Sequence, residues 1–411
     1  MKKSKRLKEL TGNYFFYKLL LFIFNIYLRL FKGLGSIDRS GIKDMEGPYL
    51  VVANHQSFWD FGAVAITCLP TQLTFVVSAH FFHSGFVGWF LSKMKCISRK
   101  QFVPDTVSIR KIMRVVKAGG SICIFPEGQT SYSGKNAEID LSIGKLAKSL
   151  HIPVVNVRVR GNHLSFPKWS NRTFRGYTEA SASVLISREQ LERMTDIEVG
   201  EAIAAGIAYD EYGWQKENLR PSRTPRTLEG MENITVMCPK CGKMRTMSSK
   251  GNRLWCSSCG YSVHADQYGL LRSEENEVIF DTPSAWVTWQ ETQIKNMFES
   301  GTLLPIVSTG RFLVSAKGKY EEHGYNAEGK GTITLDETGM TFTGTRNGKD
   351  LTLHVSPAYQ RNLTFNAQLW AFDISGDPSS EEDYAFDPDI SSDMMKIIEA
   401  WPLVRDKYFS T

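Results

Sequence analysis

Long apolar runs and cysteines are both scarce in this chain of 411 residues. No window has the roughly 20 uninterrupted apolar residues that a membrane-spanning helix needs, which excludes a polytopic membrane protein. The seven cysteines do not form the framework of a disulfide-rich secreted domain, and they favour a reducing cytosol. Hydrophobic residues make up 42% and charged residues 22%. These values are typical of globular proteins and exclude general disorder and a collagen-like repeat.

A net positive charge is also absent from most of the chain. The net charge is +6, but residues 1–32 hold eight basic residues and one acidic residue, so the remainder carries −1. The protein is therefore a nearly neutral body with a basic N-terminal segment. Nucleic-acid-binding proteins usually carry basic residues over a whole face of the fold. The charge distribution of this chain therefore does not favour a nucleic-acid partner.

The segment YFFYKLLLFIFNIYLRLF, residues 14–31, is the most apolar part of the chain. At about 100° per residue, four polar residues fall within about 60° of one another on a helix: Lys18, Asn25, Arg29 and Lys32. This pattern, with the lysine cluster before it, predicts a basic amphipathic helix over residues 1–36 that lies on an anionic membrane surface. A core helix with one wet edge and a spanning helix are the alternatives. A signal peptide is disfavoured, because no small-residue cleavage site follows and the apolar stretch is too charged.

A first cluster of chemically active side chains follows residues 49–53, YLVVA, which read as a buried strand. The string NHQSFWD comes next and contains His55 and Asp60, and a helix is expected to begin there. A carboxylate that holds one imidazole nitrogen leaves the other free to take a proton from an alcohol. The alternative is that Ser57 and Asp60 form a helix-capping pattern in which Asp60 only accepts backbone hydrogen bonds.

A second cluster follows residues 121–125, SICIF, another expected buried strand. The turn after it contains Glu127, Gly128 and Thr130. A glycine lets backbone N–H groups approach a ligand closely, and hydroxyls and N–H groups bind phosphate or a polar head group. Arg99 lies between the two clusters and could bind a phosphate through two hydrogen bonds. We therefore expect Arg99, Glu127, Gly128 and Thr130 to bind the substrate.

Together these strings resemble the glycerolipid acyltransferases typified by 1-acyl-sn-glycerol-3-phosphate acyltransferase. The resemblance covers about residues 40–190. NHQSFWD matches the NHxSxxD block, which places the family's catalytic histidine at His55 and its aspartate at Asp60. Arg99 ends the block that corresponds to phosphate binding, and FPEG at residues 125–128 matches the block that binds the acceptor.

The fourth block of the family, associated with the acyl donor, corresponds to HIPVVNVRV around Ile152 and Pro153. The chain also departs from the family. The FPEG block often continues with Thr-Arg-Ser, but here residues 129–131 read Gln-Thr-Ser and lack the arginine. This departure concerns the acceptor rather than the reaction.

Four of the cysteines form two Cys-x-x-Cys pairs with fourteen residues between them. Each pair is followed by a glycine that suits a tight turn: Cys238 and Cys241, then Cys256 and Cys259. Four thiolates close a tetrahedral shell around Zn²⁺ and leave no open position, so the spacing predicts a structural zinc ribbon. A redox dithiol would need a thioredoxin-like context, which is absent.

From about residue 285 onward, the chain alternates apolar and polar residues between turn signals. Residues 331–355 read as antiparallel strands, Asn347-Gly348 predicts a hairpin, and residues 391–408 predict a C-terminal helix. This pattern resembles a pleckstrin-homology-like module. The predicted fold is an α/β acyltransferase domain with a mixed sheet flanked by helices, followed by accessory domains. The expected parts are a membrane-interface helix 1–36, an acyltransferase domain 37–212, a linker 213–233, a zinc ribbon 234–272 and a β-rich domain 273–411.

The resemblance implies transfer of a fatty acyl group from acyl-CoA or acyl-carrier protein to a lysophospholipid hydroxyl. The expected acceptor is 1-acyl-sn-glycerol 3-phosphate, which gives phosphatidic acid in phospholipid biosynthesis. No cofactor is expected for the transfer, and the cytoplasmic face of the cell membrane is the expected location, with peripheral or monotopic attachment. Glycerol 3-phosphate or another lysolipid is an alternative acceptor. A catalytically inactive lipid-binding adaptor with a zinc ribbon is the alternative from another class.

Overall fold

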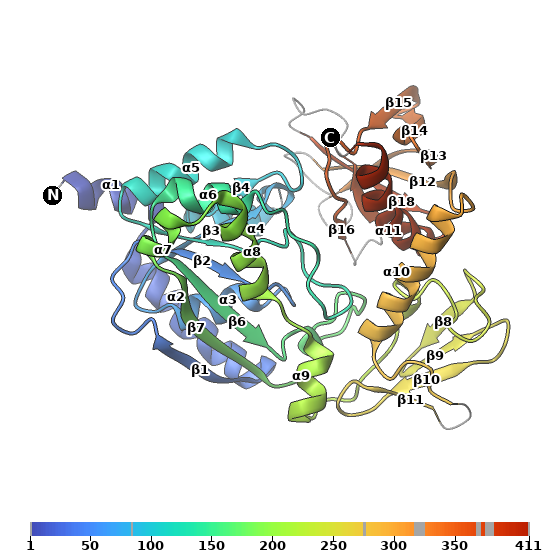
Figure 1. Cartoon of the computed structure of the whole chain (residues 1–411), viewed down its shortest axis with the longest axis horizontal. Coiled ribbons are helices and arrows are strands. Elements are labelled where there is room, and N and C mark those ends of the chain that lie inside the picture. The colour runs from blue at the N-terminus through green and yellow to red at the C-terminus, as the bar shows by residue number, and fades with distance from the viewer. Residues whose placement is uncertain are drawn as a thin grey trace.

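The computed structural model describes residues 2–83, 85–273, 277–315, 325–366, 371–374 and 382–409. Three parts follow one another along the described chain: a mixed α/β domain, a small four-stranded sheet, and a seven-stranded antiparallel sheet between two helices. Figure 1 shows the α/β domain on one side and the other two parts together on the opposite side.

The α/β domain has a seven-stranded sheet in the order β1-β7-β6-β2-β5-β3-β4. Strands β6, β2, β5, β3 and β4 are parallel to their neighbours in this series, whereas β7 is antiparallel to β6 and parallel to β1. The sheet is therefore mixed, as predicted. Its strands are β1 (Leu34–Gly41), β2 (Leu50–Ala53), β3 (Leu73–Ser78), β4 (Ile97–Arg99), β5 (Ser121–Ile124), β6 (Val154–Arg160) and β7 (Thr178–Ile186).

Both faces of this sheet are covered by helices. Buried side chains of α2 and α3 join one core, and those of α5, α6 and α8 join the core on the other face. The helices are α1 (Lys2–Thr11), α2 (Tyr14–Tyr27), α3 (Asp60–Thr67), α4 (Gly85–Lys93), α5 (Thr106–Lys117), α6 (Ile143–Leu150), α7 (Arg188–Arg193), α8 (Asp196–Ile207) and α9 (Glu211–Asn218). Short turns are η1 (Leu28–Lys32, a π-helix), η2 (Ala79–Phe82) and η3 (His163–Ser165).

The N-terminal segment forms two helices rather than one. Taken together, residues Lys5–Lys32 are long and apolar enough to cross a membrane by length and composition. The helix is nevertheless interrupted after Thr11, and the Asn13 side chain caps α2 by accepting a hydrogen bond from Phe15 N at 2.9 Å. One face of α2 is buried, and the opposite face leaves several large apolar side chains exposed: Phe15, Leu19, Phe22, Ile23 and Ile26.

Lys32 does not lie on the solvent-exposed polar stripe that the helical pattern predicts. It is buried at the end of η1, with only 7% of its surface exposed. The helical projection fails here because η1 is a π-helical turn, which advances the chain differently from an α-helix.

The four-stranded sheet contains the paired cysteines, and helix α10 joins it to the last sheet. The C-terminal sheet has the order β15-β14-β13-β12-β18-β17-β16 and is followed by α11. The β14–β15 hairpin turns at Asn347 and Gly348, which confirms that prediction. The elements are β8 (Met247–Lys250), β9 (Arg253–Cys256), β10 (Ser262–Ala265), β11 (Leu271–Arg272), α10 (Pro283–Glu299), β12 (Ile306–Ser315), β13 (Asn326–Asp336), β14 (Gly339–Arg346), β15 (Lys349–Val355), β16 (Phe365–Asn366), β17 (Ala371–Ile374), β18 (Asp383–Pro388) and α11 (Ser391–Tyr408), with η4 (Met231–Asn233) before them.

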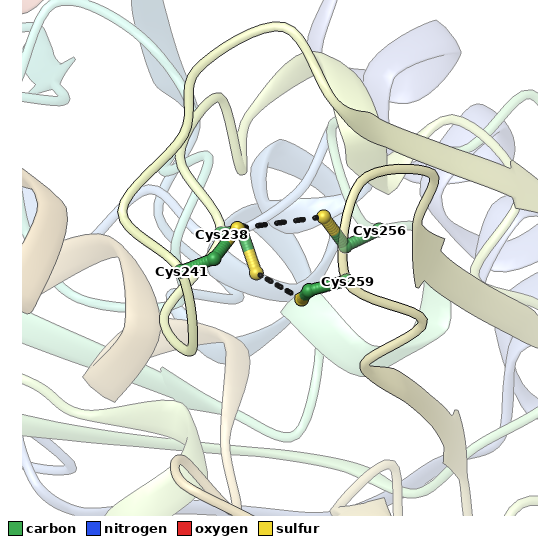
Figure 2. A group of neighbouring side chains, drawn as sticks. All are labelled: Cys238, Cys241, Cys256 and Cys259. Atoms are coloured by element: carbon green, nitrogen blue, oxygen red, sulfur yellow. Dashed lines mark hydrogen bonds between the residues drawn. The ribbon is translucent and has the colours of Figure 1, made fainter.

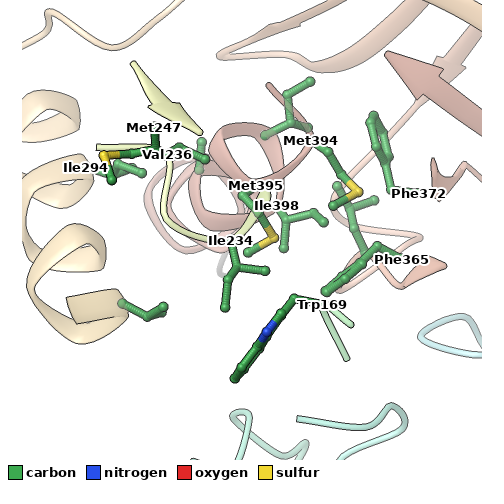
Figure 3. Packing of buried hydrophobic residues seen from close by; sticks show 14 of the residues in the cluster. Trp169, Ile234, Val236, Met247, Ile294, Phe365, Phe372, Met394, Met395 and Ile398 are labelled. Carbon is green, nitrogen blue, oxygen red and sulfur yellow. The ribbon is translucent and has the colours of Figure 1, made fainter. Parts of the chain in front are cut away.

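One hydrophobic cluster joins all three parts. It includes Trp169 from the α/β domain, Ile234 and Met247 from the cysteine-containing part, and Phe365 and Met395 from the C-terminal part. Figure 3 shows these side chains around α11. The predicted boundary at residue 212 falls inside α9, where the Glu211 carboxylate accepts hydrogen bonds from Gly161 N and Leu164 N. Helix α9 is therefore bonded to the α/β domain.

Candidate active site

The candidate site lies where β2 and β5 end. Leu50–Ala53 are fully buried, and β2 pairs with both β5 and β6 in parallel. The carboxyl ends of adjacent parallel strands meet at one edge of a sheet. The loop with His55 and the turn with Gly128 therefore lie side by side, and Ser131 N donates a hydrogen bond to His55 O at 2.8 Å.

His55 and Asp60 are in direct contact, with 3.0 Å between His55 Nδ1 and Asp60 Oδ2. Asp60 is fully buried, whereas about 20% of the His55 side chain is exposed. The same Asp60 oxygen also accepts hydrogen bonds from Gln56 N at 2.6 Å and Ser57 N at 2.8 Å. The Asp60 carboxylate therefore accepts backbone hydrogen bonds, as the alternative from the sequence supposed, and also holds the histidine. The N–H groups that it binds lie in the loop before α3, and α3 itself has no side-chain cap.

The His55 ring is fixed on a second side by Phe125. The two rings are stacked with centroids 4.2 Å apart and planes inclined by 23°. Nδ1 faces Asp60, so Nε2 is the ring nitrogen left to exchange a proton with a substrate. This geometry suits a general base with a fixed orientation.

Two asparagines support this pair: Asn54, the first residue of the NHxSxxD block, and Asn162, which no motif marks. Asn54 exchanges two hydrogen bonds with the Val159 backbone, at 2.7 and 2.8 Å, and so ties the end of β2 to β6. Asn162 follows β6 and donates a hydrogen bond to Asp60 Oδ1. Thr178 Oγ1 donates to Asn162 Oδ1 at 3.3 Å, which orients the amide. Only the tertiary structure reveals Asn162, because it is about 100 residues from Asp60 in the chain.

Glu127 lies differently from the expectation that it contacts the substrate directly. Its carboxylate is fully buried and accepts hydrogen bonds from His55 N at 2.7 Å, Asn136 Nδ2 at 2.6 Å and Ala137 N at 3.1 Å. Burial raises the pKa of Glu127 to about 8, and the three donated bonds oppose this rise. Glu127 therefore positions the backbone of His55, and a role in substrate binding stays a prediction.

Gly128 adopts a left-handed backbone conformation, with φ of +72°, and a Cβ there would lie 2.8 Å from the Phe102 ring. Both facts require glycine at this turn. Gln101 Nε2 donates a hydrogen bond to Gly128 O, so the segment after Arg99 is joined to the turn. Thr130 is half-buried, and its carbonyl accepts a hydrogen bond from Lys168 Nζ at 3.3 Å.

Arg99 ends β4, opposite Ser78 of β3. Within the described residues, its guanidinium has no hydrogen bond and no ion pair. Burial lowers the pKa of Arg99, while the charges of Asp105 and Asp140 oppose the shift. A half-buried cation without a partner is suited to bind an anion.

The residues matched to the donor block lie at the opposite edge of the sheet. Ile152 and Pro153 precede β6, and Pro153 O accepts a hydrogen bond from Leu50 N at 2.9 Å at the start of β2. His55 follows the other end of that strand. Ile152 and Pro153 therefore pack and pair the strands, and they do not contact the reacting groups.

A separate set of side chains forms a candidate metal centre in the four-stranded part. Figure 2 shows the four cysteines of the two pairs facing one another. Their sulfurs all lie within 4.8 Å of one another, with 3.7 Å between Cys238 and Cys259 and 3.8 Å between Cys241 and Cys256. A tetrahedral zinc tetrathiolate has sulfurs about 3.8 Å apart, because each Zn–S bond is about 2.3 Å long. The four cysteines thus fit a closed metal site.

Comparison with known proteins places the candidate active site in a family. Residues 34–160 match the Acyltransferase family model. A chloroplastic 1-acyl-sn-glycerol-3-phosphate acyltransferase of Brassica napus is 27% identical over 150 residues, which is 36% of this chain and 42% of the relative. A chloroplastic enzyme of the same name from Arabidopsis thaliana is 25% identical over 150 residues, 36% of this chain and 40% of the relative.

Residues 34–160 form an acyltransferase domain. His55, Asp60, Arg99 and Gly128 all lie within it. The chain matches less than half the length of the two plant relatives. A crystal structure of the 1-acyl-sn-glycerophosphate acyltransferase of Thermotoga maritima aligns with a TM-score of 0.40 at 19% identity, over 54% of this chain and 84% of that one.

Proposed function

We propose that the chain transfers a fatty acyl group from a thioester donor, acyl-CoA or acyl-carrier protein, to the hydroxyl of a lysophospholipid. The observation that carries this proposal is the His55–Asp60 pair, 3.0 Å apart, inside the acyltransferase domain. We favour 1-acyl-sn-glycerol 3-phosphate as the acceptor, which makes phosphatidic acid the product. Both plant relatives bear the name of that acceptor.

The reaction follows from the geometry of the pair. Nε2 of His55 removes the proton from the acceptor hydroxyl, while Asp60 holds Nδ1 and stabilises the resulting imidazolium. The oxygen attacks the thioester carbonyl carbon, so that a C–O bond forms and the C–S bond breaks. The imidazolium then returns the proton to the departing thiolate. Asp60 is buried and fully hydrogen-bonded, which keeps the ring orientation fixed throughout.

We assign the head group of the acceptor to the adjoining loops. The unpaired guanidinium of Arg99 supplies positive charge for a phosphate, and the turn at Gly128 and Thr130 supplies backbone and hydroxyl groups. Glycerol 3-phosphate or another lysolipid remains the second candidate acceptor, because residues 129–131 lack the arginine of the family pattern. An inactive adaptor is disfavoured by the intact His55–Asp60 contact.

The test is an acylation assay with purified full-length protein, lysophosphatidate or glycerol 3-phosphate as acceptor, and acyl-CoA or acyl-carrier protein as donor. We expect His55→Ala to lower kcat by about 10³-fold or more, because the base is lost. His354→Ala, at an exposed histidine of β15, is the matched control and should keep full activity. Undiminished turnover by His55→Ala would contradict the mechanism, and failure to acylate any lysolipid would contradict the substrate class.

We further propose that the protein acts at the cytoplasmic face of the cell membrane and attaches through α2 without spanning it. The support is the exposed apolar face of α2 beside the lysine-rich α1. Phe22→Ser should weaken binding to lipid vesicles about tenfold, since a large buried side chain contributes about 1.5–3 kcal/mol. The matched control is Ile197→Ser on α8, because Phe22 and Ile197 are each 63% exposed. Equal vesicle binding by the two variants, measured by flotation, would place the membrane contact elsewhere.

A further inference from the structure

A small pocket separates the end of the N-terminal helical segment from the loop that carries Asp60. Lys32 and Trp59 line it, together with Asn162, which bonds to Asp60. Its free volume is about 10 Å³, which is the room that one water-sized atom needs. The pocket therefore admits a single atom of a larger group rather than a whole molecule.

The Lys32 ammonium places a positive charge beside this pocket, and no ion pair among the described residues neutralises it. Its side chain is 7% exposed, and its ammonium lies 4.8 Å from the centre of the Trp59 ring and 5.9 Å from that of Tyr27. Within the described residues, Nζ makes no hydrogen bond and no ion pair. Aromatic faces attract a cation but accept no proper hydrogen bond from it. Burial of most of the side chain lowers the pKa of Lys32, so an anion beside Nζ would stabilise its charged form.

Trp59 contributes a second donor of the same kind. Its indole Nε1 is buried and has no hydrogen-bond partner in the described part of the chain. Buried polar groups are nearly always paired in folded proteins, so the unpaired indole N–H indicates a missing acceptor on the pocket that Lys32 also lines. The neighbouring turn η1 is a π-helix, a distortion that occurs frequently at functional sites.

We infer that this pocket binds one oxygen of a phosphate-type anion, between the Lys32 ammonium and the Trp59 indole N–H. The rest of the anion stays outside the pocket, whose volume admits one atom. Two sources supply this chemistry: the head group of a membrane phospholipid, or free phosphate. A lipid source suits the position of the pocket at the end of the apolar segment. Trp59 directly precedes Asp60, so the anion would lie next to the proposed catalytic loop without contacting the reacting groups.

The experiment measures binding rather than turnover, so it does not depend on the proposed reaction. All proteins carry Arg99→Met, which removes the proposed acceptor site. They are titrated at constant ionic strength with inorganic phosphate, and separately with phosphatidylglycerol vesicles. We expect Lys32→Met to raise the half-saturating concentration of at least one probe about tenfold, as expected for loss of a hydrogen bond to a charged group. Lys18→Met removes one exposed charge from the same segment and should change either value by no more than about threefold.

The pattern of results also identifies the source. A tenfold effect confined to the vesicles supports a lipid head group, and one confined to inorganic phosphate supports a free anion. Equal changes for Lys32→Met and Lys18→Met with both probes would overturn the site. If Lys32→Met does not fold, Trp59→Phe carries the test, because it keeps the ring and removes the N–H. Binding that is weakened severalfold by Trp59→Phe supports the site, and unchanged binding overturns it.

Discussion

The two oxygens of the Asp60 carboxylate have different partners. Oδ2 serves His55 and two backbone N–H groups, whereas Oδ1 has Asn162 as its one partner among the described residues. We expect Asn162→Ala to lower kcat about tenfold to hundredfold with little change in KM, the effect of losing a hydrogen bond to a charged group. Asn162 acts through its hydrogen bond to Asp60, so we assign it as a positioning residue. Steady-state kinetics measures the two parameters separately.

Asn156→Ala is the matched control for that prediction. Asn156 is also buried in β6, but it donates its hydrogen bond to Gly206 O, at 2.6 Å, away from Asp60. Its loss should lower the free energy of unfolding and leave kcat unchanged. Equal losses of kcat in the two variants would show that Asn162 contributes stability alone.

For individual residues, the sequence predicts contacts within one short segment better than contacts between distant segments. The His55–Asp60 contact was predictable because five residues span a loop and the first turn of a helix. The environment of Glu127 was not, because its partners Asn136 and Ala137 lie in an irregular loop with no fixed geometry. The position of Lys32 depends on a π-helical turn, for which the sequence has no recognised signal.

Elements with a strong local pattern were also predictable. The strands Leu50–Ala53 and Ser121–Ile124 lie within their predicted apolar runs, and α11 begins at Ser391 as predicted. The order of the strands was not predictable, because it depends on pairings such as β2 with β6, more than 100 residues apart. The prediction of one helix missed the interruption between α1 and α2, although Gly12 and the Asn13 cap stand directly before the apolar run of residues 14–31.

The element that contains the paired cysteines is a small sheet with little core of its own. Cys238 and Cys256 belong to the same buried cluster as residues of α10 and α11. We expect one Zn²⁺ per chain, and we expect a chelator or Cys256→Ser to lower Tm by several degrees or more, because metal binding contributes to folding. Elemental analysis and thermal unfolding measure the two quantities.

Cys96→Ala provides the comparison for the zinc prediction. Cys96 is half-buried in the acyltransferase domain and lies outside the cysteine pairs. Its loss should leave the zinc content unchanged. A protein purified without added metal that contains no zinc, and whose Tm does not respond to zinc or to chelator, would exclude a structural zinc site.

In the whole molecule, the C-terminal part and α10 make hydrogen bonds to the loops that carry the candidate site. Arg361 N donates to Phe102 O at 2.9 Å, beside Gly128, and Tyr132 OH donates to Glu291 at 3.0 Å on α10. These contacts come from segments far apart in the sequence, and no local pattern predicts them. The site is therefore held by the accessory part as well as by its own domain.

Lys168 lies at this junction and makes the coupling testable through pH. Its ammonium donates to Gln129 Oε1 at 3.1 Å and lies 3.7 Å from the centre of the Phe365 ring. Burial lowers the pKa of Lys168 from 10.5 to about 7, and the charge of Asp373 opposes this shift. The unfolded chain therefore binds more protons than the folded chain between about pH 7 and pH 10.5. Over this range, Lys168 makes the free energy of unfolding rise with pH.

Replacement of Lys168 by Met should remove this contribution. We expect Lys168→Met to be more stable relative to wild type at pH 6.5 than at pH 9.5, by about 1–3 kcal/mol, because the buried charge is fully present only at the lower pH. Denaturant unfolding at the two pH values measures the difference. Lys145→Met, at an exposed lysine of α6, should show the same difference from wild type at both values. Parallel pH profiles for wild type and Lys168→Met would mean that the ammonium is solvated and that the junction is open in solution.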